Sequence, residues 1–435
     1  MTRVLALTPY PPRTDGRHGG SRAMAASLLA LADAHELGLL YLRRPGEPEA
    51  DPALTHRAAL TVAVPHPERA TAGTALLRAR TGELAAALTG TPAWVRWTAS
   101  PALAREAAAL AASFRPGVVQ LEQHVMAQFA AALPEHGPAR VLVVHEPGAA
   151  AAHEQRLAAT EARLAPRSLD ARARARTPLR GLDARARART ALRSLDARAW
   201  ARWERRALAG MDAVVAFTEA DRATLARYAL PAPAEVIPLP VEVPPEAASH
   251  AGTEPHTLLF VGDYAHPPNA AAAEALLGDI LPRVRRDLAD AALVLVGQHA
   301  DRLGALSTPG ATATGQVDDV RPHLERAALV LAPLWTGGGM RVKVLHALAA
   351  GKAVVATPRA VAGLGLRDGE EVAVAETPAT FATAITRLLR APEARAAMGA
   401  AARRWALAQP AGEAYARRYA QVWDAAIARR GAAPA

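Results

Sequence analysis

Short apolar strands and Ala-rich helices alternate along this chain in two runs, and their order constrains the fold more than any other feature. In the first run the predicted strands lie at residues 4–8, 37–42, 60–64, 118–121, 141–145 and 213–217. The helical patterns between them lie at residues 21–35, 74–88, 101–113 and 125–133. Alternation of this kind predicts a parallel sheet with helices on both faces.

A Pro-rich stretch at residues 231–256 interrupts the alternation, and its lack of a helical period indicates an extended linker. A second run then predicts strands at residues 257–261, 292–296, 328–332 and 353–357, with helices at 270–286 and 340–350. The tail from residue 392 to about 430 is almost continuously helical, with a break near Pro410. Two such α/β domains joined by a hinge normally bind a ligand between the carboxyl ends of their strands.

Composition narrows the cellular setting. The chain has 435 residues and no cysteine, so it forms neither disulfides nor a thiolate zinc site, and a reducing cytoplasm is expected. Residues 1–12 run from an apolar strand into a Pro-rich turn and lack the apolar core and cleavage site of a signal peptide. No apolar run approaches the roughly 20 residues that span a bilayer. We therefore expect a cytoplasmic protein that is soluble or, at most, peripheral on the inner face of the membrane.

The net charge of +10 is concentrated in one segment, because residues 167–206 hold 13 arginines against four acidic residues. This segment contains a repeat with a period of 13 residues that begins at Leu169, Leu182 and Leu195. One interpretation is a solvated helical extension, inserted at about 165–206. The other is a basic arm that contacts anionic lipid or another polyanion. Nucleic acid is not expected as a partner, because no aromatic platform accompanies the arginines.

Two Gly-rich loops are candidates for chemistry. The first follows the strand at residues 4–8 and places Gly16, Gly19 and Gly20 before a helix, where free backbone N–H groups and the helix dipole favour an anion. Its spacing matches neither a Walker loop nor a dinucleotide fingerprint, so a plain turn is an equal alternative. The second loop is stronger, because residues 337–339 are three consecutive glycines between a strand and a helix.

Arg341 and Lys343 follow that second loop in the first helical turn, where cations oppose the helix dipole. An anion bound between them would remove this penalty, so the pattern predicts a diphosphate site; a surface-facing Arg/Lys pair is the alternative. The helix ends at Gly351. Beyond the next strand, Gly363 and Leu364 lie in a further Gly-rich turn that we expect near a nucleotide base or sugar.

Several motifs together resemble the family 4 retaining glycosyltransferases of GT-B fold. In the second domain they read "LFVGDYAHPPNAAAAEAL" from 259, "GQVDDVRPHLERAALVLAPL" from 315 and "PLWTGGGMRVKVLHALAAGKAVVATP" from 333. The first domain matches more loosely, with "TPYPP" at 8, "VVQLEQHVMAQF" at 118, "VVHEP" at 143 and "RWERRALAGMDAVVAFTEADR" at 202. The Arg-rich repeat has no counterpart in that pattern and has the character of an insertion.

The resemblance implies two Rossmann-like, doubly wound parallel-sheet domains that face each other across a cleft. Residues 1–240 would bind the acceptor, 241–256 would be the linker, and 257–408 would bind the donor. The final helix, at 409–435, would pack back on the first domain. The implied reaction moves a hexose from a nucleotide-diphosphate sugar to a glycan, lipid or small-molecule hydroxyl. No cofactor is implied beyond this co-substrate.

Site residues carry over from the resemblance position by position. Arg341 and Lys343 would bind the donor pyrophosphate and neutralise the leaving group as its charge develops. The remaining donor-binding positions would be Gly19, Gly20, Gly262, Asp263, Asn269, Gly338, Gly339, Met340, His346, Gly363 and Leu364. Retaining enzymes of this fold often lack a protein nucleophile, so none is assigned.

Two positions depart from the family pattern, and the second of them departs from its Gly-rich subgroup as well. Many members carry two glutamates eight residues apart, one near the donor sugar and one on the nucleotide ribose, and here those positions hold Gly338 and His346. A neutral imidazole accepts one hydroxyl hydrogen bond where a carboxylate accepts two. His346 therefore either alters donor affinity or nucleotide choice, or is a helix residue with no ligand contact. A catalytically degraded relative that binds a nucleotide sugar or glycan is the alternative function.

In the first domain, Glu122 follows a buried strand, and a carboxylate there can orient the acceptor or the donor sugar in catalysis. His124 and the pair His145 and Glu146 lie at comparable strand ends, where they would orient the acceptor or bond to nearby backbone. No metal is expected, because no Asp-x-Asp motif or histidine cluster with ligand spacing is present.

Overall fold

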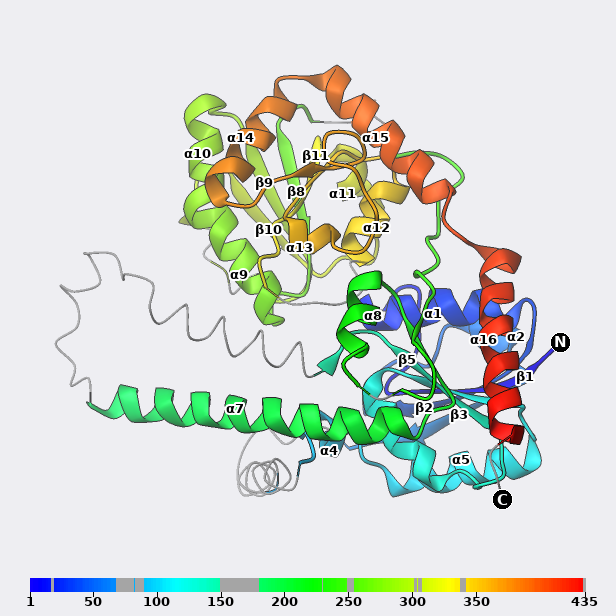
Figure 1. The fold of residues 1–435 in the computed structure, drawn as a ribbon. Helices are drawn as coiled ribbons and strands as arrows, with labels where there is room; N and C mark the ends of the chain where they lie inside the picture. The colour runs from blue at the N-terminus through cyan, green and yellow to red at the C-terminus, as the bar shows by residue number, and fades with distance from the viewer. Residues whose placement is uncertain are drawn as a thin grey trace.

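The chain forms two parallel-sheet α/β domains in a computed structural model (Figure 1). The structure describes residues 1–16, 19–67, 82, 90–148, 180–228, 230–248, 254–300, 303, 307–336 and 342–432. The first sheet has the strand order β3-β2-β1-β4-β5-β6-β7, and all its pairs are parallel. Its strands are β1 (Arg3–Thr8), β2 (Glu36–Arg43), β3 (Leu60–Pro65), β4 (Val118–Glu122), β5 (Ala139–Val144), β6 (Ala213–Ala216) and β7 (Glu235–Val236).

The second sheet has the order β10-β9-β8-β11-β12-β13, again entirely parallel. Its strands are β8 (Thr257–Val261), β9 (Ala292–Val296), β10 (Ala311–Gly315), β11 (Leu329–Ala332), β12 (Val354–Ala356) and β13 (Ala373–Val374). In both sheets the strand order reverses beside the first strand, at β1/β4 and at β8/β11. Both domains are therefore doubly wound, as predicted.

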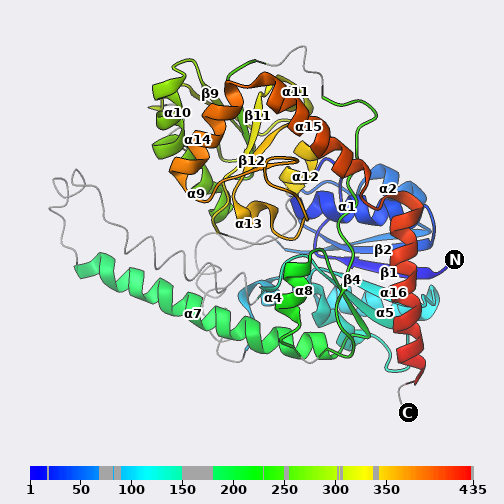
Figure 2. The ribbon, with the colours of Figure 1, turned by 45° about the horizontal axis from the view of Figure 1, so that its top comes forward.

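Helices cover both faces of each sheet (Figures 1 and 2). Those of the first domain are α1 (Gly19–Ala32), α2 (Pro52–Arg57), α4 (Ala93–Trp97), α5 (Pro101–Ser113), the 3₁₀-helix η1 (His124–Ala132), α7 (Arg180–Ala209) and α8 (Glu219–Leu225). Those that follow β8 are α9 (Pro267–Ala275), η3 (Leu276–Ile280), α10 (Leu281–Asp287), α11 (Arg321–Arg326), α12 (Val342–Ala349), α13 (Pro358–Val361), α14 (Pro378–Leu389), α15 (Pro392–Leu407) and α16 (Gly412–Ala432).

The ten predicted strands are confirmed to within two residues at each end, because buried strands of a parallel sheet are nearly continuous apolar runs. The predictions missed β7, which lies inside the segment 231–256 that was expected to be extended linker, and the two outer strands β10 and β13. In β10 exposed and half-buried side chains alternate, so it lacks an apolar run. The helix expected at 74–88 lies almost entirely outside the described residues.

The helix predicted at 270–286 is divided by the π-helical turn η3 between α9 and α10. Pro282 explains the interruption. Proline has no N–H and its ring collides with the carbonyl four residues before it, which is accommodated by a wider turn. The tail helix breaks between α15 and α16, beside Pro410, as predicted.

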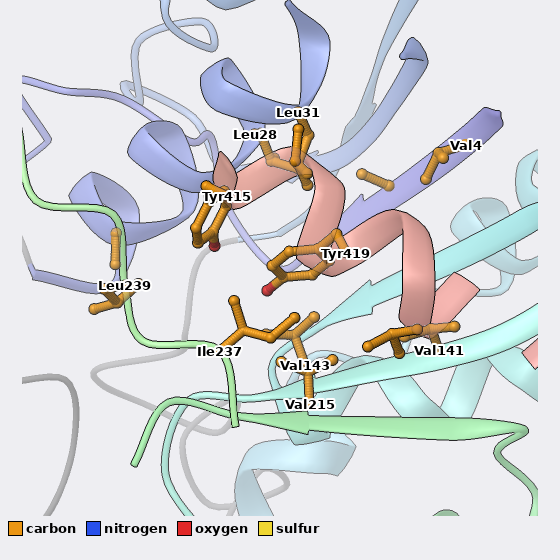
Figure 3. Packing of buried hydrophobic residues seen from close by; sticks show 14 of the residues in the cluster. Val4, Leu28, Leu31, Val141, Val143, Val215, Ile237, Leu239, Tyr415 and Tyr419 are labelled. Atoms are coloured by element: carbon orange, nitrogen blue, oxygen red, sulfur yellow. The ribbon is translucent and has the colours of Figure 1, made fainter. Parts of the chain in front are cut away.

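Helix α16 lies on the sheet of the first domain, although it follows the second domain in sequence (Figure 1). Tyr415 and Tyr419 lie between α1 and the strands, near Leu28, Leu31 and Val143 (Figure 3). The Tyr415 hydroxyl also lies 2.8 Å from Ser27 Oγ of α1. The last helix thus fixes the position of α1, the helix that begins at the first Gly-rich loop.

Helix α7 contains the second and third copies of the 13-residue repeat and projects from the first domain (Figures 1 and 2). The third copy carries Trp200, Trp203 and Glu204 where the second has Arg187, Thr190 and Ala191. These three side chains are buried, and Glu204 accepts hydrogen bonds from Gly148 N and Tyr228 Oη at 2.9 and 2.7 Å. Three substitutions have therefore made the third copy a packed element. Most of the first copy, 169–179, lies outside the described residues.

Candidate active site

The two points of strand-order reversal are where a doubly wound sheet binds ligands. In the first domain, β1 leads to the loop before α1 and β4 ends at Glu122. In the second domain, β8 leads to Gly262 and β11 leads towards α12. Helix α1 contacts α12, so the two regions adjoin at the seam between the domains.

Lys343 lies at this seam, in the first turn of α12. Its Nζ donates a hydrogen bond to Asn269 Oδ1 at 2.6 Å and lies 4.5 Å from the centre of the Phe260 ring. Burial lowers the pKa of Lys343 to about 7. No carboxylate pairs with this ammonium among the described residues. Lys343 is therefore a cation held by an amide and an aromatic face, at a helix end that disfavours positive charge.

The end of β8 leaves little room for side chains beside Lys343. A carbon added at Gly262 would lie 3.0 Å from Asn269 and 3.3 Å from Lys343 Nζ. Gly297 has a φ of +132°, and a carbon there would overlap the carbonyl oxygen of Gly262. Asp263 follows and lies 2.9 Å from His299 Nδ1. The expected residues Gly262 and Asn269 are thus brought against Lys343, whereas Asp263 pairs with a histidine that the motifs did not indicate.

Helix α1 begins at Gly19, opposite the start of α12. A carbon added at Gly19 would lie 3.6 Å from Val342 Cγ2, so the amino-terminal ends of the two helices meet. The next residue, Gly20, packs against Tyr10, whose hydroxyl accepts a hydrogen bond from Gln123 Nε2. Free N–H groups and dipoles of two helix ends therefore adjoin at one place, which favours an anion.

His346 lies one turn into α12 and its side chain is exposed to solvent. Desolvation by the surrounding protein and, to a smaller extent, the positive charge of Arg22 on α1 lower its pKa to about 4. His346 is therefore a neutral imidazole at physiological pH. Arg22 is half-buried, and no motif had indicated it.

Glu122 is completely buried and belongs to a chain of hydrogen bonds. Its Oε1 accepts from Gln120 Nε2 at 2.6 Å, and its Oε2 lies 2.7 Å from His145 Nε2. Gln120 Oε1 accepts in turn from Trp423 Nε1 on α16, at 3.1 Å. Because a carboxylate only accepts, His145 Nε2 is the donor of this hydrogen bond, and the buried His145 Nδ1 has no partner among the described residues. Glu122 is thus bonded to protein groups through both of its oxygens.

His124 packs between two tryptophans, with ring centroids 5.3 Å from Trp94 and 4.6 Å from Trp200. Burial, with a smaller contribution from the charge of His145, lowers its pKa to about 3. Both ring nitrogens are buried without a hydrogen-bond partner. His124 is therefore neutral, and its immediate surroundings are apolar. Glu146, the remaining expected residue of this domain, is half-buried after His145.

Gly363 and Leu364 lie at the contact between the domains. Gly363 has a φ of +80°, and a carbon there would lie 2.5 Å from Thr218 Cβ in the first domain. Leu364 lines a small pocket together with Phe217, Leu345 and Trp405. Residues of both domains line this pocket.

Four expected donor residues, Gly338, Gly339, Met340 and Arg341, lie outside the described residues.

Within the described ranges, no three His, Asp or Glu side chains are grouped so that they could hold a metal ion. The helices of the same ranges include none with the length and apolar character needed to cross a bilayer. Motif reasoning also missed Phe260, Gln120 and Trp423, whose roles come from contacts between distant parts of the chain.

The sequence of the second domain matches a known family. Residues 255–391 match the family described as "Glycosyl transferases group 1". This range extends from just before β8 to the end of α14, so it includes Lys343 and the residues around it. No curated protein matches the chain. The family match supports a glycosyltransferase.

Solved structures share the fold over nearly the whole chain. Sucrose-phosphate synthase from Thermosynechococcus elongatus is 15% identical with a TM-score of 0.62, covering 98% of this chain and 100% of that chain. WaaG, a glycosyltransferase involved in lipopolysaccharide biosynthesis, is 15% identical with a TM-score of 0.57, covering 96% and 99%. HepE from Anabaena, solved in complex with UDP and glucose, is 13% identical with a TM-score of 0.56, covering 97% and 99%. The fold of this chain is GT-B, as the resemblance implied.

Proposed function

We propose that the chain is a retaining, metal-independent glycosyltransferase that moves a hexose from a nucleotide-diphosphate sugar to a hydroxyl acceptor. The observation that carries this proposal is the position of Lys343. It is a partly desolvated cation at the start of α12, beside the start of α1, inside the segment that matches the group 1 glycosyl transferases.

The donor diphosphate would lie at these two helix ends. As the bond between the sugar and the diphosphate breaks, negative charge grows on the departing oxygen, and Lys343 with Arg341 would neutralise it. Gly19 and Gly20 would let backbone N–H groups approach the phosphates from the first domain. Binding of a diphosphate raises the pKa of Lys343, so the protonated amine is stabilised in the complex.

The acceptor would bind at the carboxyl ends of β4 and β5. His145 and Glu122 lie at these strand ends, and Glu122 would act by fixing the orientation of the His145 imidazole through their hydrogen bond. Glu122 is thus a positioning residue in this proposal. The adjoining buried His124 and its tryptophans would border the acceptor.

A second candidate function is a degraded relative that binds a nucleotide sugar without turnover. The observation that favours it is His346, a neutral and exposed imidazole where the family pattern has a ribose-binding carboxylate.

Turnover separates the two candidates. Purified protein is incubated with UDP-, GDP-, ADP- and dTDP-hexoses and a panel of sugar and lipid acceptors, and release of the nucleoside diphosphate is measured. The anomeric configuration of any product is read by NMR. An α-linked product from an α-linked donor supports the proposal. Inversion contradicts retention, and tight donor binding with no turnover on any acceptor favours the degraded relative.

A further inference from the structure

Arg22 and His346 face each other across the seam between the domains. Gly19 and Val342 are in contact, and Arg22 and His346 lie one helical turn further along their respective helices, three and four residues on. Residues at these spacings share a helix face, so both side chains follow the contact into the seam. The effect of the Arg22 charge on the pKa of His346 reports the same proximity.

Among the described residues, only one of the three guanidinium nitrogens of Arg22 makes a hydrogen bond. Its Nε donates a hydrogen bond to Gly16 O at 2.7 Å, which fixes the side chain. Its two Nη groups have no hydrogen-bond partner among the described residues. Asp15 is the carboxylate whose charge acts on Arg22, and both of its oxygens are already bonded to Arg13, at 2.6 and 2.7 Å. Arg22 therefore offers charge and several donors towards the seam.

Lys343 likewise offers a positive charge and hydrogen-bond donors, from the second domain. Lys343 directly follows Val342, which adjoins α1, and positions 343 and 346 lie three residues apart on neighbouring turns of α12, so Lys343 borders the seam. Burial lowers the pKa values of both Arg22 and Lys343, so each cation is partly desolvated, and neither forms an ion pair within the described part of the chain. Such an arrangement is stabilised by an anion shared between the two side chains.

We propose that Arg22 completes the donor diphosphate site from the first domain, so that the diphosphate bridges Arg22 and Lys343 and holds the two domains together. This inference rests on the proposed function and adds a residue and a mechanical role to it. Arg22 is a binding residue, and its planar fork suits two phosphate oxygens at once. His346, neutral beside it, leaves the charge of Arg22 for the phosphate.

The test uses inorganic pyrophosphate as the probe, titrated by calorimetry into the full-length wild type, Arg22→Met, Arg22→Lys, Lys343→Met and Arg105→Met. Arg105 lies exposed on α5 and controls for the loss of one positive charge. We expect Arg22→Met to lower affinity about 10- to 100-fold, Arg22→Lys to restore part of it and Arg105→Met to change it less than about twofold. Melting temperatures confirm that the variants are folded.

Hydrogen exchange then tests the bridge itself. In the wild type, pyrophosphate should protect amides at the starts of both α1 and α12. In Arg22→Met at saturating pyrophosphate, protection should persist at α12 and disappear at α1. If Arg22→Met binds as the wild type does while Lys343→Met does not, the diphosphate site stands and the bridge is refuted. If the wild type does not bind at millimolar pyrophosphate, both the proposed donor site and the bridge are refuted.

Discussion

The chain has only two lysines: Lys343 lies in the first turn of α12, and Lys352 lies three residues beyond the end of that helix. Lys352 is almost fully buried, and its Nζ donates hydrogen bonds to the carbonyls of Glu325 and Ala327 at 2.8 and 3.2 Å. These carbonyls end α11, where a helix dipole favours a cation. Lys343 lies at a helix start, where the dipole opposes it, and its protein contacts are an amide oxygen and an aromatic ring.

The difference shows what each lysine is for. Lys352 caps a helix and satisfies buried acceptors, so its place follows from the stability of the fold. Lys343 lowers that stability, because burial disfavours its charge and no carboxylate of the described residues compensates. Residues that break a local electrostatic rule are expected at functional sites. The two lysines therefore form a matched pair, in which one substitution tests structure and the other tests binding.

The largest effect on stability is expected from Lys352→Met. The substitution leaves two buried carbonyl groups without their charged donor, so the free energy of unfolding should fall by about 3 kcal/mol. Urea denaturation measures this change. The folded fraction should bind nucleoside diphosphates as the wild type does; a large loss of affinity would show that Lys352 is not purely structural.

Lys343→Met should have the opposite profile. Loss of a charge-assisted bond to the diphosphate should weaken binding about 30-fold, which corresponds to about 2 kcal/mol. The free energy of unfolding should change by less than about 0.5 kcal/mol, because removing this cation also relieves its conflict with the helix dipole. Calorimetry and urea denaturation are run on the same samples. A loss of stability as large as that of Lys352→Met would contradict the comparison.

The pKa of Lys343 predicts a pH dependence. The protonated amine binds the diphosphate, and the complex raises its pKa above the value of about 7 in the free protein. Affinity should therefore be full below pH 7 and fall as pH rises above it, about tenfold per unit, or about 1.4 kcal/mol, until the pKa of the complex is reached. Titrations from pH 6 to 9 measure the slope. In Lys343→Met this slope should vanish, which separates it from ionisation of the nucleotide.

The smallest effect is expected for His346→Ala. Its side chain is exposed, so stability should change by less than about 0.5 kcal/mol. Loss of one hydrogen bond to the nucleoside should lower nucleoside diphosphate affinity about fivefold and leave pyrophosphate affinity unchanged. Equal weakening of both ligands would place His346 on the phosphates instead.

The sequence predicted the fold well because apolar runs and Pro-rich breaks are local signals. Both domains and the break near Pro410 followed from order and spacing, whereas Gly262 and Asn269 were named only through the family resemblance. The role of Glu122 did not, because its partners His145 and Trp423 come from β5 and from α16, far along the chain. Arg22 was missed for the same reason, since its importance depends on a helix of the other domain. Strand β10 was missed because its side chains are exposed or half-buried, so its sequence has no apolar run.

The most direct test of the account is a thermal-shift titration of UDP, GDP, ADP and dTDP against the wild type, Lys343→Met and Lys352→Met. We predict that one of the four diphosphates raises the melting temperature of the wild type. It should raise that of Lys352→Met by a similar amount from a lower starting point, and it should leave Lys343→Met unchanged. The donor base would then be known before any acceptor is sought. An equal shift in Lys343→Met and the wild type, or no shift in the wild type at millimolar concentration, would contradict the assignment of the donor site to the start of α12.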